Sequence, residues 1–236
     1  MGKRGLSHIE FVISFVIFAA FIAFAFMFFS PLQSNRTLKS SLDYAWLEVD
    51  DMTKNKLETY SVFINPESGT VYAGQDIAID IDGIPNDFNA SVENSSGSSI
   101  PSYIDDDGAV HFTDPEDNFV RIKYSPVFPN GTLIGGVLLR ESDYSISSSE
   151  SEEIYFEKLF DDLNRSYFSN YTGLKKQFNL PNRVDWGFAV KFNETYEINA
   201  VKEIPEEAEV LSKSERLQAV SKSGLKEYVD VRVFVW

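Results

Sequence analysis

The stretch KRGLSHIEFVISFVIFAAFIAFAFMFF, from Lys3 to Phe29, decides the N-terminal architecture of this chain. Between Phe11 and Phe29 its only polar residue is Ser14. As an α-helix this run would be roughly 28 Å long, which matches the hydrocarbon thickness of a bilayer. Pro31 and the residues after it offer no small-residue cleavage site, which argues against a secretory signal peptide. The sequence therefore predicts one membrane-crossing helix over residues 6–30.

The distribution of charge orients this predicted helix. Lys3 and Arg4 precede it, while the chain as a whole carries a formal charge of −15. Because basic residues are retained on the cytoplasmic side, a cytoplasmic N-terminus is predicted, with everything after Pro31 outside. The acidic head disfavours nucleic acid as a partner, since phosphate backbones are bound by clustered lysine and arginine. The expected location is the cell membrane, crossed once, with an extracellular head.

The junction KRGLSHIEF combines a basic pair, a glycine and an apolar helix with one carboxylate near its start. It resembles the class III signal peptide of archaeal type IV pilins. The resemblance implies that a prepilin peptidase recognises the basic pair and cuts between Gly5 and Leu6, so that residues 1–5 form a leader. It also implies that Glu10, the fifth residue of the mature chain, pairs with the free amine of a neighbouring pilin-like subunit in a surface filament.

The position of Glu10 also has a physical reason. A carboxylate near the hydrocarbon boundary is costly unless it reaches the interface or finds a cation. Cleavage would create such a cation at the amino group of Leu6. The alternative is that Glu10 marks the edge of an uncleaved anchor, preceded by ordinary topogenic charges.

No sequence pattern indicates an enzyme. Cysteine is absent, so disulfides, zinc–thiolate sites and thiol nucleophiles are excluded. The two histidines, His8 and His111, belong to no catalytic or metal-binding motif, and we predict no catalytic residue, cofactor or metal ligand. Two acidic clusters, Asp105–Asp107 and Asp114–Asp117, leave calcium binding open beside the alternative that acidic turns simply end strands.

Sequons for N-glycosylation are frequent in the part predicted to be extracellular. Glycans would be compatible with that location, although a sequence rich in asparagine and serine also generates sequons by chance. The possible acceptors are Asn35, Asn89, Asn94, Asn130, Asn164, Asn170 and Asn193.

Periodicity divides the remaining chain into helical and strand-like parts. Apolar residues at three- and four-residue steps predict an amphipathic helical extension over residues 31–60, separated from the first helix by a break at Pro31. Over residues 61–236, alternation predicts a β-rich antiparallel head with a terminal hairpin turning at Ser221–Gly224. One further helix is predicted from about Ser151 to Tyr171.

The serine-rich run Ser145–Ser151 is predicted to be a loop or linker. The head could divide into two domains there, or it could form a single composite sheet. The fold class predicted is α+β, with a long hydrophobic N-terminal helix in a membrane or filament core, an amphipathic helix, and a β-rich head with one further helix.

These features predict a structural protein whose chemistry is association. The head over residues 61–236 is large for a subunit that builds a whole filament, so a minor or accessory pilin-like subunit is expected. The alternative is a single-pass surface protein that never polymerises, such as an envelope anchor, a stator or an adhesin.

Overall fold

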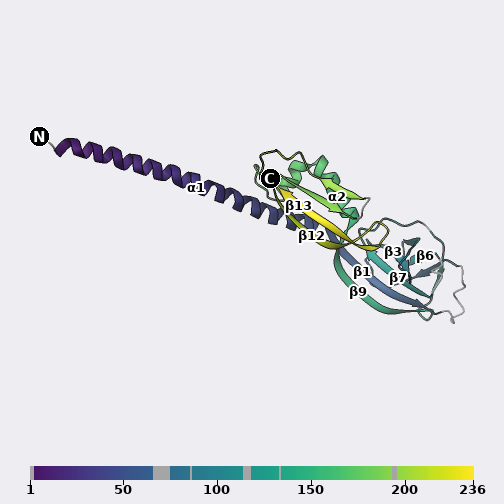
Figure 1. Cartoon of the computed structure of the whole chain (residues 1–236). Helices are drawn as coiled ribbons and strands as arrows, with labels where there is room; N and C mark the ends of the chain where they lie inside the picture. The colour runs from purple at the N-terminus through teal and green to yellow at the C-terminus, as the bar shows by residue number, and fades with distance from the viewer. Residues whose placement is uncertain (1–2, 66–74, 86, 114–117, 133, 193–195) are drawn as a thin grey trace.

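The computed structural model describes residues 3–65, 75–85, 87–113, 118–132, 134–192 and 196–236; the side chains of residues 3–8 and 26–35 are also outside the description. Three α-helices occur in this part of the chain: α1 (Lys3–Thr53), α2 (Glu157–Ser169) and α3 (Tyr171–Gln177). The first of them projects from a β-rich head, so that the N-terminus lies far from the C-terminus (Figure 1).

The first strand begins directly after α1, and the others follow along the described ranges, with α2 and α3 between β9 and β10. The strands are β1 (Lys54–Ile64), β2 (Ile77–Ile79), β3 (Asn89–Asn94), β4 (Ser99–Ile100), β5 (Ser102–Ile104), β6 (Val110–Phe112), β7 (Phe119–Ser125), β8 (Val137–Leu138), β9 (Tyr144–Phe156), β10 (Trp186–Lys191), β11 (Glu197–Ala200), β12 (Leu211–Val220) and β13 (Lys226–Val235). One sheet has the order β11-β10-β13-β12-β9-β1-β7-β3-β4, and a smaller one has the order β5-β6-β2-β8. The pairing is antiparallel, as predicted, except where β12 meets β9 and β2 meets β8.

The first helix differs from the prediction in two respects. It runs without a break from Lys3 to Thr53, through Pro31. A proline removes a single amide donor, and here the helical hydrogen bonds on both sides of it persist. The helix then ends before residue 60, because β1 begins at Lys54.

The fold class predicted from the sequence is wrong in its membrane-crossing element. Within the part of the chain that the structure describes, no helix combines the length and the apolar character needed to cross a membrane. The apolar side chains described between Ile9 and Ala25 belong instead to the exposed first part of one continuous helix. The chain has a β-rich α+β fold, and the head carries two further helices, α2 and α3, rather than one.

The head has two lobes. The proximal lobe contains residues 157–236 and packs on the last part of α1. Its core lies between the helices and one face of β10–β13, and includes Trp46, Phe160, Trp186 and Val231. The predicted apolar stripe of α1 is confirmed at its buried members Leu38, Leu42, Ala45, Trp46 and Val49. Burial of each large side chain contributes on the order of 2 kcal/mol, so this packing fixes α1 to the head.

The distal lobe contains β2–β8 together with residues 58–64 of β1 and 144–151 of β9. Its two sheets enclose a second core that includes Val62, Ile79, Phe112 and Ile122. Alternate residues of β1 and β7 enter this core, while the residues between them lie on the opposite face of the large sheet.

A long ribbon of β1 and β9 connects the two lobes (Figure 1). The prediction of a loop over Ser145–Ser151 is wrong, because this run lies inside β9 and pairs with β1. Most of its side chains are exposed on both faces, so hydrophobic alternation was missing from the sequence. The predicted start of the next helix at Ser151 is also wrong, because β9 continues to Phe156 and α2 begins at Glu157.

The predicted terminal hairpin is confirmed. β12 and β13 pair along their whole length, from Leu211↔Val235 to Val220↔Lys226. Val229, Val231, Val233 and Val235 are buried on one face of β13. The turn between these strands contacts the distal lobe, where Lys123 donates a hydrogen bond to the carbonyl of Gly224.

Candidate functional site

The first part of α1 is an apolar surface exposed to solvent on all sides. Its large side chains are between 38% and 73% exposed from Ile9 to Phe24. They include three consecutive positions, Phe11, Val12 and Ile13, and four more from Phe15 to Phe18. Because consecutive helical residues point about 100° apart, such runs cover the whole circumference. We call residues 9–25 the apolar shaft.

Small residues interrupt the bulky side chains of the apolar shaft. Ala19, Ala20 and Ala23 lie among phenylalanines at positions 18, 21 and 24. Small residues let helix backbones approach closely, and the rings beside them fill the grooves of a neighbouring helix. The surface is therefore suited to packing against other apolar helices.

The predicted processing residues lie at the start of α1. Lys3, Arg4, Gly5 and Leu6 have helical backbone, and their side chains are outside the described set. The first amides of any helix lack intrahelical acceptors, so this end can unwind at low cost to enter a protease. The structure is thus compatible with access to the Gly5–Leu6 bond.

Glu10 lies one turn further along, at the beginning of the apolar shaft. Its side chain is exposed and forms no ion pair with any residue that the structure describes. A carboxylate in this position is accessible to a cation from another molecule.

The candidate glycosylation sites differ in their surroundings. Asn89 donates from Nδ2 to the carbonyl of Phe128, 2.9 Å away. The Oδ1 of Asn94 accepts from the amide of Ser98 at 2.8 Å, and the Oδ1 of Asn164 is buried inside α2 without a described partner. A glycan on any of these would disturb local packing.

Asn130 and Asn170, in contrast, are exposed on connections between elements. Asn35 has helical backbone in α1 with its side chain outside the description, and Asn193 lies outside the described residues. On steric grounds Asn130 and Asn170 are the acceptors that a glycan could occupy most easily.

The first acidic cluster forms a hydrogen-bonded turn. Asp105 accepts from the amides of Asp107 and Ala109 at 3.0 and 2.9 Å, and its Oδ2 lies 2.8 Å from Nε2 of His111. Burial alone would raise the pKa of Asp105, but these hydrogen bonds outweigh it and lower the pKa. Asp114–Asp117 lies outside the described residues, and elsewhere in the described chain no three carboxylate or histidine side chains converge.

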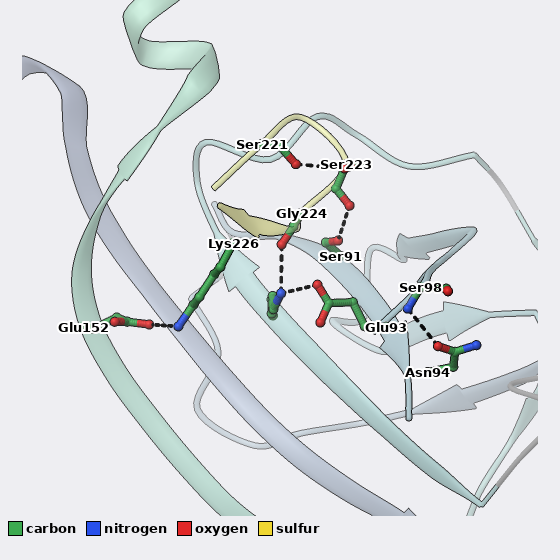
Figure 2. A network of polar contacts seen from close by, with 10 residues as sticks. Ser91, Glu93, Asn94, Ser98, Glu152, Ser221, Ser223, Gly224 and Lys226 are labelled. Carbon is green, nitrogen blue, oxygen red and sulfur yellow. Dashed lines mark hydrogen bonds and ion pairs between the residues drawn. The ribbon is translucent and has the colours of Figure 1, made fainter. Parts of the chain in front are cut away.

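The most buried ion pair of the described residues lies where the two lobes meet. Lys123 of β7 and Glu93 of β3 form an ion pair in which each side chain is 5% exposed. Lys123 Nζ also donates to the carbonyl of Gly224, 2.8 Å away, in the β12–β13 turn. Figure 2 shows this turn lying over β3, with Ser91 Oγ directed at the carbonyl of Ser223. Burial lowers the pKa of Lys123, and Glu93 opposes that shift.

A second ion pair flanks this interlobe contact. Lys226, at the start of β13, pairs with Glu152 of β9 (Figure 2). Sequence reasoning missed both pairs, because nothing near Lys123 or Glu93 indicates a covering turn from more than a hundred residues away. The turn itself was predicted, and its partner was not.

Comparison with known proteins gives no match: no protein family, no curated protein and no solved structure is significantly similar to this chain.

Proposed function

We propose that this chain is a pilin-like structural subunit, a minor or accessory component of an archaeal type IV pilus-like filament at the cell surface. The observation that supports this most directly is the apolar shaft, which is exposed around its whole circumference. The role is structural, with association in place of catalysis.

Exposed apolar surface of this extent favours a partner of the same kind. Burying one large apolar side chain contributes roughly 1.5–3 kcal/mol, and the shaft carries such side chains on every face. The shafts of sister subunits, packed side by side, would provide this environment on all sides of each helix. Contacts that repeat from one copy to the next without closing a ring generate a helical filament.

The start of α1 supports the same assembly. A prepilin peptidase that cuts after Gly5 would leave a positive amino group on Leu6. Glu10 is exposed and unpaired among the described residues, so it could receive the amino group of a neighbour. Each shaft would then enter the assembly with its carboxylate neutralised.

The continuity of α1 explains how the head would be displayed. The same helix that forms the shaft is packed into the proximal lobe through Leu42, Trp46 and Val49. A shaft held in a filament would therefore present the head outward in a fixed orientation.

The absence of cysteine allows a direct test by disulfide trapping. Phe15→Cys places a thiol on the shaft, where the native side chain is 63% exposed. Phe168→Cys is the matched control, because Phe168 is an equally exposed ring on α2. We expect mild oxidation of cells of the native host to give covalent multimers of the Phe15→Cys protein and monomers of the Phe168→Cys protein. A Phe15→Cys protein that stays monomeric while reaching the cell surface would contradict the proposal and indicate a surface protein that does not polymerise.

A further inference from the structure

The large sheet has an open polar face in the distal lobe. Val62 of β1 and Ile122 of β7 point into the core of this lobe. Their neighbours Ser61 and Arg121 therefore point to the opposite side, and they face each other across the strands. This side of the sheet is not covered by the smaller sheet.

A groove of about 450 Å³ lies on this face. Its floor is formed by β1, β3, β7 and β9, and one end is bounded by Leu225 and Lys226 at the β12–β13 turn. The turn therefore contributes part of the wall of the groove. We call it the interlobe groove.

The floor of this groove carries hydroxyl and carboxylate side chains on the neighbouring strands β1 and β9. Ser61 lies opposite Ser148, and Thr59 lies opposite Glu150. The Oγ1 of Thr59 is shielded from solvent and has no hydrogen-bond partner among the described residues, so the hydroxyls that a ligand can reach are those of Ser61 and Ser148.

Arg121 is the available cation of the groove. Lys123 and Lys226 are paired with Glu93 and Glu152, whereas Arg121 forms neither an ion pair nor a hydrogen bond with the described residues. Arg121 is exposed, and its guanidinium carbon lies 5.7 Å from the ring centre of Phe119 in a cation–π contact.

An exposed aromatic ring extends the same face. Phe63 follows Ser61 by two residues on β1, lies opposite Phe119, and is 46% exposed. The face thus offers a ring, a guanidinium and hydroxyl groups within one strand length.

We propose that the interlobe groove binds a polysaccharide that carries carboxylates on some of its sugar rings. Arg121 would bind a carboxylate with two parallel hydrogen bonds. Ser61 and Ser148 would exchange hydrogen bonds with sugar hydroxyls, and Phe63 would lie against the apolar face of a ring. This binding is independent of filament assembly.

Other polymers fit the groove less well. A nucleic acid carries a charge on every residue, which the exposed carboxylate of Glu150 would repel. An extended peptide adds to a free strand edge, whereas β1 and β7, which carry Ser61 and Arg121 in the middle of the floor, are already paired on both sides. A sugar chain with spaced carboxylates satisfies Arg121 without crowding Glu150.

The test is calorimetric titration of the full chain in detergent micelles with hyaluronan oligosaccharides, which alternate a uronic acid with a neutral sugar. Carboxyl-reduced hyaluronan and dextran serve as ligand controls. We expect binding to hyaluronan that weakens with salt, and at least about tenfold weaker binding to carboxyl-reduced hyaluronan. Absence of hyaluronan binding, or equal binding of the carboxyl-reduced form, would overturn the proposal.

Two variants locate the binding. Arg121→Gln is expected to weaken hyaluronan binding about tenfold or more at an unchanged melting temperature. The matched control is Arg216→Gln, because Arg216 is another exposed arginine, 5.3 Å from the ring centre of Tyr228 on the proximal lobe. Phe63→Ser should also weaken binding. Equal losses in Arg121→Gln and Arg216→Gln would show general charge attraction and contradict a site in the groove.

Discussion

The ion pair of Lys123 and Glu93, buried in the distal lobe under the β12–β13 turn, gives the sharpest prediction about stability. Replacing Lys123 by methionine keeps most of the side-chain volume but leaves Glu93 charged and 5% exposed. Removing one partner of a buried pair costs about 3–5 kcal/mol, because the remaining charge is uncompensated. The carbonyl of Gly224 would lose its donor as well, so the β12–β13 turn should detach from β3.

Thermal unfolding of the full chain, followed by near-ultraviolet circular dichroism, measures this effect. For a protein of this size each kcal/mol lowers the melting temperature by about 2–4 °C, so Lys123→Met should lower it by roughly 6–20 °C. The double variant Lys123→Met with Glu93→Leu should recover most of the loss, since no unpaired charge remains.

An exposed pair provides the control. Arg165 and Asp162 form an ion pair on α2 with side chains 75% and 42% exposed. Arg165→Met should cost less than about 1 kcal/mol. If Lys123→Met were no more destabilising than Arg165→Met, the pair of Lys123 and Glu93 would not stabilise the fold. That result would refute the reasoning.

Two other predictions concern stability. Burial raises the pKa of Tyr155 and of Tyr167 to about 12, so both stabilise the fold fully below the unfolded value of 10.0 and lose that contribution as the pH rises toward 12. Urea midpoints should therefore be level up to about pH 9 and fall above pH 10, and a rise across that window would contradict the assignment. Gly224 has φ +86°, and a Cβ there would lie 2.0 Å from Ser91 Oγ, whereas Gly83, at φ +87°, faces open space. Gly224→Ala should thus lower the melting temperature more than Gly83→Ala, and equal shifts would show that the turn is not docked.

The sequence predicted the elements that bury one face, because their apolar residues recur at the spacing of that face. In β13, Val229 and Val233 alternate with Asp230 and Arg232, and the structure buries the valines as the pattern requires. The stripe of α1 was predictable for the same reason, since one side of that helix is covered by the proximal lobe.

Elements without a buried face left no such signal. β9 pairs with β1 through its backbone while its serines remain exposed, so the run from Ser145 resembled a linker. The pair of Lys123 and Glu93 was not predictable either. Lys123 lies on the face of β7 that points away from the core of the distal lobe, and it is buried there because the β12–β13 turn covers it. Arg121 and Ser61 became candidates only when the register of β1 and β7 was known.

The apolar stretch illustrates a different difficulty. Hydrophobicity alone predicted a membrane-crossing helix that ends near Pro31. The structure instead shows a helix continuous with the part that packs into the head, and no described helix meets the requirements of a membrane span. Composition identified an unusual surface, and the structure shows that this surface is the exposed part of a longer helix.

The most direct test of the proposed function is the N-terminal sequence and intact mass of the protein in the surface-filament fraction of its native host. The account predicts Leu6 as the first residue, in material that sediments with filaments. A protein that begins at Met1 or Gly2 in the presence of an active class III prepilin peptidase, and that is absent from the filament fraction, would contradict the account.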